Sequence, residues 1–500
     1  MPARPLDPSP PWVRLLRFLD RTRWWWFAGL AALYLAGFNG QWRATPDSAL
    51  HLDAARLWVE DGTPVVDPEL LGKVQPGLGL VIAAPAAIGL VSTDAPQAAR
   101  FASFLMLGFA AAVLALTYRL LLLHADRPTA VLTVLLVGTN AQFYEMGFNL
   151  LTEIPFAAGL LLVLWGHERR LKRPGRLASS LGLMAVGVGL MAVFRSVAAV
   201  VVGAYLLAEL VRVVGRRDQR RLGLALLGFA GGAGAALAWG VPAIRQDAVL
   251  FGQTLGSLDP ERLLINTQEL ANAVLPEAFL GQAVPPPISW PLAAAALAAG
   301  SALLRRRLLW AVLVGVFVLQ WLVFLADLRY VLPLLPLWFY GGWSLLIAVC
   351  HRLPRRPAHV LFGLVVFCVL TGNLIGVGHH LRQQRSPDFY AAYRHGKYVP
   401  VRALARALTE RALPEEVVLT SHRVWAEMAV WSKRRVIGAP DRAGRALQGG
   451  DWVVLPLSEM SSKQLAAAGL SWGPAVAESG HGEQTWTLHR LVAAPATDGR

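Results

Sequence analysis

Residues 177–214 read LASSLGLMAVGVGLMAVFRSVAAVVVGAYLLAELVRVV, an apolar run of almost forty residues in which Arg195 is the first charged side chain. A helix needs about 20 apolar residues to cross the hydrocarbon core of a bilayer. The run therefore predicts two membrane spans that meet at a bend near Arg195. Comparable stretches recur from the N-terminus to about residue 378, so the sequence predicts an all-α polytopic membrane protein with about 11 transmembrane helices.

The eleven predicted spans cover residues 24–42, 99–121, 129–147, 154–167, 177–194, 196–214, 222–241, 288–304, 308–326, 330–350 and 358–378. A further apolar stretch at 78–91 is short and rich in Pro and Gly, and we expect it to lie beside the membrane. The chain has 500 residues, 55% apolar and 16% charged. Soluble domains average about 25% charged residues, so this composition argues against a soluble enzyme and against a disordered chain.

Basic residues cluster in alternate connecting segments, at 4–23, 119–127, 169–176, 212–221, 305–307 and 352–356. Short cytoplasmic loops carry the excess of Lys and Arg in membrane proteins. This pattern predicts a cytoplasmic N-terminus and, with eleven spans, a C-terminus outside. It also accounts for much of the net charge of +15 without a nucleic acid partner.

The predicted organisation has three parts. Residues 1–23 form a cytoplasmic segment, residues 24–380 form the transmembrane domain with outer loops at 43–98 and 242–287, and residues 381–500 form a small extracytoplasmic α/β domain. In this last domain we expect helices at 399–413 and 461–469 and strands at 416–420, 452–456 and 485–491. Only two cysteines occur, both in apolar segments, so no disulfide framework is expected.

The first outer loop contains TPDSALHLDAARLW at residues 45–58. Thr45 is suited to cap a helix that Pro46 begins and Gly62 ends. Asp47 and His51 are four residues apart and share a face of this short amphipathic helix, which we expect to lie on the outer membrane surface. In the simpler interpretation, Asp47 only complements the helix dipole.

Further polar groups fall at outer positions. Glu153 lies among apolar residues at the mouth between two spans, where an acid is costly and usually functional; alternatively it is an ordinary charge at a helix N-terminus. Arg195 stands at an outer bend. The other candidates are Lys73 and Gln75 before the apolar stretch at 78–91, and Asp327, Arg329 and Tyr330 at the end of a span. Asp327 and Arg329 could also form a purely local ion pair. Carboxylates and cations at one interface favour chemistry on an anionic, lipid-linked substrate.

Several motifs recur in a recognisable order: Pro46-Asp47-Ser48, residues 75–78 (QPGL), residues 152–156 (TEIPF), Arg195 at a bend, and residues 329–333 (RYVLP). Together they resemble the GT-C membrane glycosyltransferases of the dolichyl-phosphate-mannose protein mannosyltransferase and aminoarabinose transferase type. The resemblance covers roughly residues 15–380. It implies transfer of a sugar from a polyprenyl-phosphate donor to an acceptor outside the cytoplasm, usually with inversion. The acceptor, whether lipid, glycan or protein, is left open. With the composition rich in Ala, Leu and Arg, the resemblance also implies a location in the bacterial inner membrane, with the active site facing the periplasm.

Carried over by position, Asp47 resembles the general base and Glu153 the second-loop acid. Arg195 and Arg329 resemble the cations that face the donor phosphate, and Tyr330 could line the donor site. The chain departs from the family where many relatives have Asp-Glu in place of Asp47-Ser48. No metal site is predicted, although a divalent cation held by Asp47 and Glu153 stays open. No nucleotide-binding motif is present.

Two other classes of protein remain as alternatives. A transporter or lipid flippase keeps ionisable groups near the bilayer midplane, whereas here the acids gather at outer mouths. A non-catalytic scaffold would keep Asp47, Glu153 and Arg195 apart, with no cavity between them. The glycosyltransferase interpretation requires these acids and arginines to converge at the external leaflet.

Overall fold

The computed structural model describes residues 11–62, 77–195, 197–214, 259–281, 307–323, 328–330, 332–420, 424–437, 447–457, 459–481 and 484–494, with isolated short pieces between 223 and 298. The chain divides into two compact units, which we describe separately. The helical unit comprises Met1–Phe38, Glu69–Gly77 and Phe104–Arg382, and the mixed unit comprises Asn39–Pro68, Leu78–Ser103 and Gln383–Arg500. Residues 39–68 and 78–103 therefore share a compact unit with the C-terminal tail.

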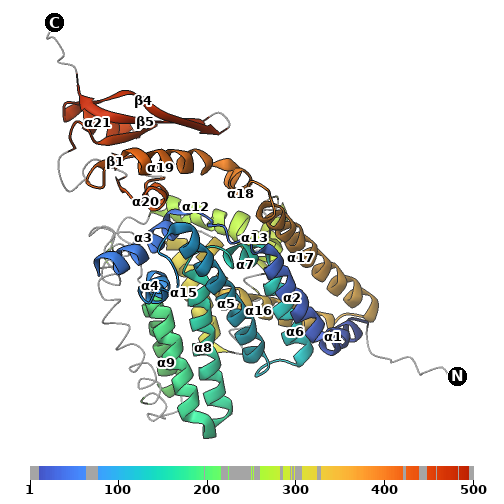
Figure 1. The fold of residues 1–500 in the computed structure, drawn as a ribbon. Helices are drawn as coiled ribbons and strands as arrows, with labels where there is room; N and C mark the ends of the chain where they lie inside the picture. The colour runs from blue at the N-terminus through green and yellow to red at the C-terminus, as the bar shows by residue number, and fades with distance from the viewer. Residues whose placement is uncertain are drawn as a thin grey trace. The chain divides into compact units, whose positions relative to one another are not determined.

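The helical unit is built mainly from helices, several of them long (Figure 1). Its described helices are α1 (Pro11–Arg21), α2 (Arg23–Gly37), α5 (Ala95–Leu121), α6 (Arg127–Gly138), α7 (Ala141–Met146), α8 (Glu153–Lys172), α9 (Leu177–Phe194), α10 (Ala198–Val214), α12 (Pro260–Glu269), α13 (Leu275–Leu280), α15 (Leu308–Val323), α16 (Leu335–Cys350) and α17 (Arg355–Gln384). Short turns of other helix types are η1 (Pro174–Arg176), η2 (Leu270–Val274), η3 (Leu328–Tyr330) and η4 (Leu332–Leu334).

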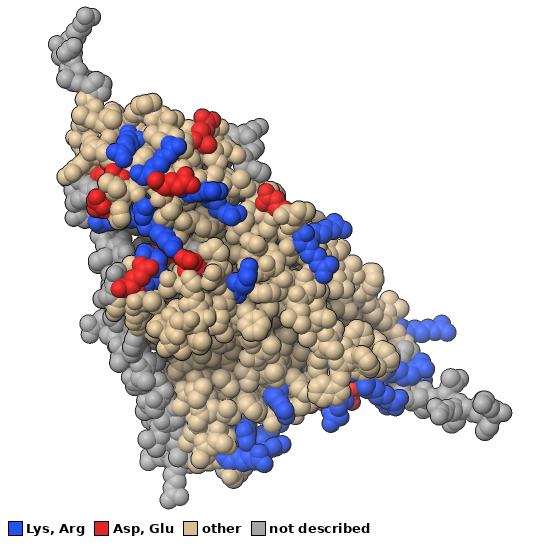
Figure 2. Space-filling view, viewed as in Figure 1, with Lys and Arg blue, Asp and Glu red and all other residues tan. Residues whose placement is uncertain are grey.

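Four helical stretches of the described chain are long and apolar enough to cross a membrane: Pro96–Leu121, Leu177–Phe194, Leu332–Cys350 and Arg355–Gln384. Shorter apolar helices cover Gly77–Ala87, Arg127–Gly138, Ala198–Val211 and Leu308–Leu319. On the face drawn in Figure 2, a broad band of the helical unit shows no charged side chains, while Lys and Arg gather at one end of that band. The chain is an integral membrane protein.

Most predicted spans coincide with a helix, but several boundaries differ. The predicted span 129–147 is two helices, α6 and α7, because Asn140 interrupts it: its side chain accepts a hydrogen bond from the Phe143 amide and caps α7. The predicted span 24–42 ends early, at Gly37. Span 222–241 and most of 288–304 lie outside the described residues, so the count of eleven stays a prediction.

Helices α8 and α9 form a tight antiparallel pair. A Cβ placed on Gly187 would lie 2.7 Å from the carbonyl oxygen of Gly159, and one on Gly159 would lie 2.8 Å from the Gly187 carbonyl oxygen. Such small residues let two helix backbones approach closely in a membrane. This packing brings the first residue of α8, Glu153, to the same end of the pair as Arg195, which follows the last residue of α9.

The mixed unit combines helices with one sheet. Its elements are α3 (Pro46–Asp61), α4 (Gly77–Ala87), α18 (Phe389–Ala392), η5 (Tyr393–Gly396), α19 (Val399–Arg411), β1 (Val417–Leu419), α20 (Trp425–Ser432), β2 (Arg435–Ile437), β3 (Trp452–Leu455), α21 (Glu459–Ala467), β4 (Leu470–His481) and β5 (Gln484–Ala493). The strand order is β2-β1-β3-β5-β4. Strand β1 pairs in parallel with β2 and β3, whereas β5 pairs in antiparallel with β3 and β4.

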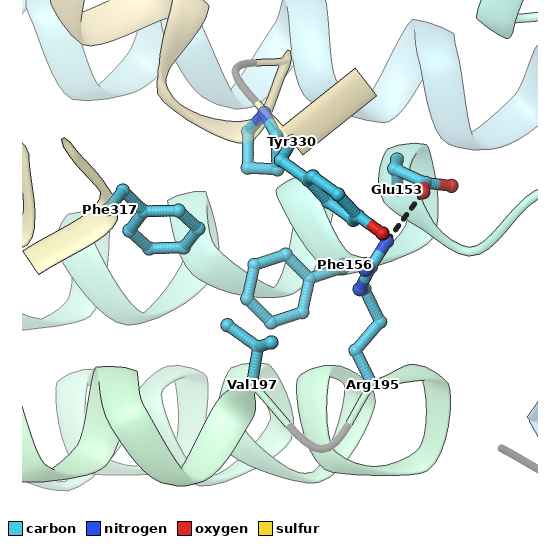
Figure 3. Close-up of a pocket in the computed structure, with 7 residues that line it drawn as sticks. Glu153, Phe156, Arg195, Val197, Phe317 and Tyr330 are labelled. Carbon is cyan, nitrogen blue, oxygen red and sulfur yellow. Dashed lines mark hydrogen bonds and ion pairs between the residues drawn. The ribbon is translucent and has the colours of Figure 1, made fainter. Parts of the chain in front are cut away.

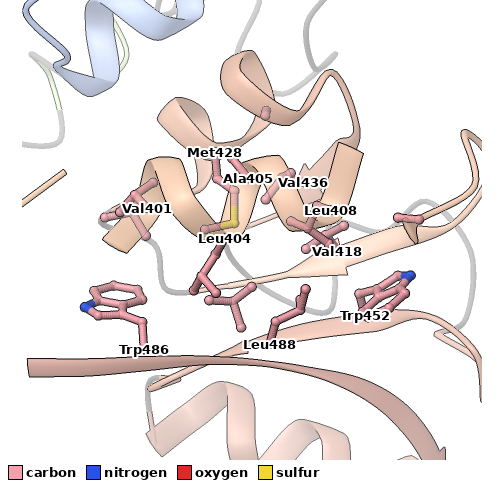
Figure 4. Close-up of a cluster of buried hydrophobic side chains, with 14 residues drawn as sticks. Val401, Leu404, Ala405, Leu408, Val418, Met428, Val436, Trp452, Trp486 and Leu488 are labelled. Atoms are coloured by element: carbon pink, nitrogen blue, oxygen red, sulfur yellow. The ribbon is translucent and has the colours of Figure 1, made fainter. Parts of the chain in front are cut away.

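Both faces of this sheet are covered. Because alternate side chains of a strand point to opposite faces, Val418 and Val454 join α19 and α20 in one core, drawn in Figure 4. Val417 and Val453 join Leu465 of α21 in a second core on the other face. The predicted small α/β domain is thus present, with its expected helices and strands at nearly the expected residues.

Candidate functional site

A polar cluster lies at the α8–α9 end of the helical unit. Glu153 is the first residue of α8 and is 3% exposed. Its Oε1 accepts a hydrogen bond of 2.6 Å from Nη1 of Arg195 and lies 3.9 Å from Nε of Arg329. A charge-assisted contact of this length is among the stronger interactions available to a buried carboxylate. Its Oε2 is buried and has no hydrogen-bond partner within the described part of the chain.

Arg195 reaches this acid because α9 ends at it. Its backbone is extended (φ −152°, ψ 136°), its amide closes the last turn on the Met191 carbonyl, and α10 begins three residues later. The predicted bend at Arg195 is therefore confirmed, and its location on the outer side of the membrane stays a prediction. A guanidinium here needs a partner since it interrupts a long apolar run, and Glu153 is that partner.

Tyr330 contacts both Arg195 and Arg329. Its ring lies 5.0 Å from the guanidinium carbons of both Arg195 and Arg329. Nη2 of Arg329 also donates a hydrogen bond of 3.2 Å to the Tyr330 hydroxyl. Cations near an aromatic face are attracted by its quadrupole, so Tyr330 holds two like charges close to one another while Glu153 offsets one of them. One carboxylate against two guanidinium groups leaves a charge of +1.

A hollow of about 240 Å³, counting its open mouth, adjoins this cluster. Figure 3 shows Glu153, Arg195 and the Tyr330 hydroxyl together, with Phe156, Val197 and Phe317 on the remaining sides. Its lining thus sets charged and hydroxyl groups on one side against apolar side chains on the other.

The other candidates are distributed differently. Asp47 and His51 belong to α3 of the mixed unit: the Asp47 side chain is exposed in the first turn, and His51 is 5% exposed. Lys73, Gln75 and Asp327 lie outside the described residues. The structure thus brings together Glu153, Arg195, Arg329 and Tyr330, and the convergence of Asp47 with them stays a prediction.

The α3 helix has the predicted ends but a different environment. Thr45 caps it, Pro46 is its first residue and Gly62 follows it with φ 70°. We expected an amphipathic helix on the membrane surface. Instead, residues 48–55 are buried without a break, since α20 of the tail packs on this helix. The sequence reasoning missed α20 itself, which the apolar residues at 424–431 could have indicated.

No three His, Cys, Asp or Glu side chains in the described ranges come close enough together to hold a metal ion. Ser48 follows Asp47, and its hydroxyl accepts hydrogen bonds from the Thr45 amide and the Trp42 indole. Ser48 is fully buried. Its role here is structural.

Solved structures with the same architecture identify the fold. The structure of ArnT from Cupriavidus metallidurans bound to undecaprenyl phosphate matches with a TM-score of 0.56 and 13% identity, covering 94% of this chain and 98% of that one. The apo form of the same protein matches with a TM-score of 0.55 and 14% identity, covering 93% of this chain and 97% of that one. The chain has a GT-C fold.

A second protein with this GT-C fold matches over a smaller share of its length. The archaeal oligosaccharyltransferase AglB from Archaeoglobus fulgidus, in complex with an inhibitory peptide and a dolichol-phosphate, gives a TM-score of 0.52 and 12% identity. It is covered to 65%, against 84% of this chain. No protein-family model matches the sequence, and no curated protein matches it either. The GT-C resemblance expected from the motifs is confirmed for the fold.

Proposed function

We propose that this protein is an integral membrane glycosyltransferase that moves a sugar from a polyprenyl-phosphate donor to an acceptor outside the cytoplasm. The observation that carries the proposal is the buried Glu153–Arg195 pair, completed by Arg329 and Tyr330, beside a hollow with one polar and one apolar side. A lipid phosphate has the same two-sided character. The fold adds support, because the two similar proteins were solved with undecaprenyl phosphate and with a dolichol-phosphate.

The proposed reaction proceeds with inversion and without a covalent intermediate. The Asp47 carboxylate takes the proton of the acceptor hydroxyl, whose oxygen attacks the anomeric carbon. The bond between that carbon and the phosphate oxygen breaks, and its electron pair leaves with the polyprenyl phosphate. Arg195 and Arg329 stabilise the negative charge that develops on this leaving group.

Within this proposal Glu153 is a positioning residue. Its Oε1 already binds Nη1 of Arg195 at 2.6 Å, so this oxygen is engaged in holding the guanidinium. Glu153 orients Arg195 toward the hollow and prevents the two arginines from repelling each other. Lys73, Gln75, His51 and Asp327 remain candidates for binding the donor or acceptor.

The decisive experiment uses the purified protein in lipid nanodiscs with a panel of radiolabelled polyprenyl-phosphate sugars, and it scores release of the free lipid phosphate. Release by the wild type and loss of release in Asp47→Asn would support the proposal, with a reduction of about 10²–10⁴-fold expected for a missing general base. Wild-type turnover in Asp47→Asn would refute the role of Asp47. Passage of an intact lipid across the bilayer without bond cleavage would favour the flippase class instead.

The proposed orientation has its own test. An alkaline phosphatase fused after residue 500 of a bacterially expressed chain is active only in the periplasm. An active fusion would support an external C-terminus and hence a site facing the periplasm, and an inactive fusion with normal expression would contradict both.

A further inference from the structure

The first turn of α3, which carries Asp47, is fixed by a reciprocal pair of hydrogen bonds. The Thr45 hydroxyl accepts a bond of 3.1 Å from the Ser48 amide, and the Ser48 hydroxyl accepts one of 2.9 Å from the Thr45 amide. This arrangement is a capping box. Asp47 lies between the two capping residues, so the path of its backbone is set by them.

Trp42 extends this fixed turn. Its Nε1 donates a hydrogen bond of 3.0 Å to the Ser48 hydroxyl, and its side chain is 2% exposed. A buried indole N–H needs a hydrogen-bond partner, because a buried donor left without one costs about 1–3 kcal/mol. Any displacement of Trp42 is therefore transmitted to Ser48 and to the turn that carries Asp47.

The contacts that hold Trp42 in place come from residues of the C-terminal tail. The ring of Trp431, on α20, packs against it edge-on with centroids 4.8 Å apart. The hydroxyl of Tyr390, on α18, donates a hydrogen bond of 3.0 Å to the Trp42 carbonyl. The rings of Tyr390 and Tyr398 in turn pack on the ring of Trp431, with centroid separations of 6.0 Å and 6.1 Å. Burial raises the pKa of Tyr390 to about 12, so its hydroxyl remains a donor at neutral pH.

From these contacts we infer that the tail domain positions the proposed base: Tyr390 and Trp431 hold Trp42, and Trp42 holds the capped turn that carries Asp47. The inference rests on the proposed function, since it assigns a role through Asp47. A misplacement of about 1 Å at a reacting group can cost about 10²-fold in rate. Tyr390 and Trp431 then affect the reaction only through Trp42, and neither of them needs to touch a substrate.

The test uses three variants of the full chain that remove single contacts. Tyr390→Phe removes the hydroxyl and keeps the ring, Trp42→Phe removes the indole donor, and Trp431→Leu removes the edge-on contact. We expect turnover at saturating donor to fall about 10–100-fold in each, with the KM for the donor and the affinity for polyprenyl phosphate unchanged. The matched control is Trp452→Phe, which removes an indole donor from the sheet of the same unit, where it bonds Glu416. It should keep wild-type turnover.

Each variant is then combined with Asp47→Asn. If the tail acts through Asp47, Trp42→Phe adds no further loss in that background. An equal further loss, or wild-type turnover in both Trp42→Phe and Tyr390→Phe, would overturn the inference. A loss of turnover that matches a loss of folded protein by size-exclusion chromatography would also overturn it. Failure of the proposed function is seen separately, as wild-type turnover in Asp47→Asn alone.

Discussion

Glu153 and Arg195 stand 42 positions apart in the sequence, and their side chains meet at 2.6 Å with the acid almost fully buried. The first begins α8 and the second ends α9, so the contact is a direct product of the antiparallel pairing of these helices. A buried ion pair contributes little net stability, because the desolvation of both charges offsets their attraction. This agrees with the proposed role of the pair in binding a lipid phosphate at the adjoining hollow.

Glu153→Gln separates a positioning role from a catalytic one. The amide oxygen can still accept a hydrogen bond from Arg195, while the local charge rises from +1 to +2. We expect turnover to fall by less than about 10-fold and polyprenyl phosphate to bind more tightly, as measured by product inhibition. A fall of about 10²–10⁴-fold would instead mark Glu153 as an acid or base of the reaction.

Arg195→Gln should act on both chemistry and stability. Removal of one donor to a developing negative charge typically costs about 10²–10³-fold in turnover. It also leaves the buried Glu153 carboxylate with only the longer contact of 3.9 Å to Arg329, which should lower the melting temperature in nanodiscs. The double variant Glu153→Gln/Arg195→Gln removes that stranded charge. It should therefore melt above Arg195→Gln alone while remaining as inactive, and equal melting temperatures would contradict the pairing.

Gly187→Ala tests whether the α8–α9 contact sets the site. The added Cβ would meet backbone atoms of Gly159 at 2.7 Å and Val163 at 2.9 Å, which cannot rotate away. We expect a destabilisation of about 1–3 kcal/mol, together with weaker binding of polyprenyl phosphate. Gly189→Ala on the same helix is the control, because nothing lies within 4 Å of a Cβ there. Equal behaviour of the two variants would refute this prediction.

The buried carboxyl of Glu427 makes the stability of the mixed unit depend on pH. This carboxyl is fully buried beside Tyr398, Lys397 and Arg394, and burial raises its pKa to about 7 from 4.5. Between about pH 4.5 and 7 the folded form keeps a proton that the unfolded form has lost. Stability is therefore fully present below that window and falls as the pH rises through it, by up to about 3 kcal/mol.

The measurement is the melting temperature of the solubilised protein at pH 5 and at pH 8. The wild type should melt lower at pH 8, and Glu427→Gln should lose most of that difference because its amide does not titrate. A wild-type melting temperature that rises from pH 5 to pH 8, with Glu427→Gln unchanged in that trend, would contradict the assignment.

The parts of the fold that depend on local pattern could be predicted from the sequence. The apolar periodicity located α5, α9 and α17, and the capping residues Thr45 and Gly62 gave the ends of α3. Strand β4 was missed. Gly473 and Pro474 interrupt its alternation, and its register against β5 shifts between Trp472 and Ala477, so the backbone pairing has no simple counterpart in the side-chain pattern.

The residues of the site could be predicted from the sequence, but the contacts between them could not. Arg195 and Glu153 stood out because charged residues in apolar runs are costly, and that argument is local. Their pairing, and the placement of Tyr330 between two guanidinium groups, depend on the approach of segments far apart in the chain. For the same reason the burial of α3 was not foreseen: it is caused by α20, almost 380 positions away.

The glycine contact between α8 and α9 has a consequence for how a lipid would be received. With two backbones touching and no side chain between them, this helix pair has little freedom to slide or splay. Under the proposed function, Arg195 is consequently oriented before a lipid phosphate binds, and the entropy of ordering its backbone is lost once, during folding, and not again at each turnover.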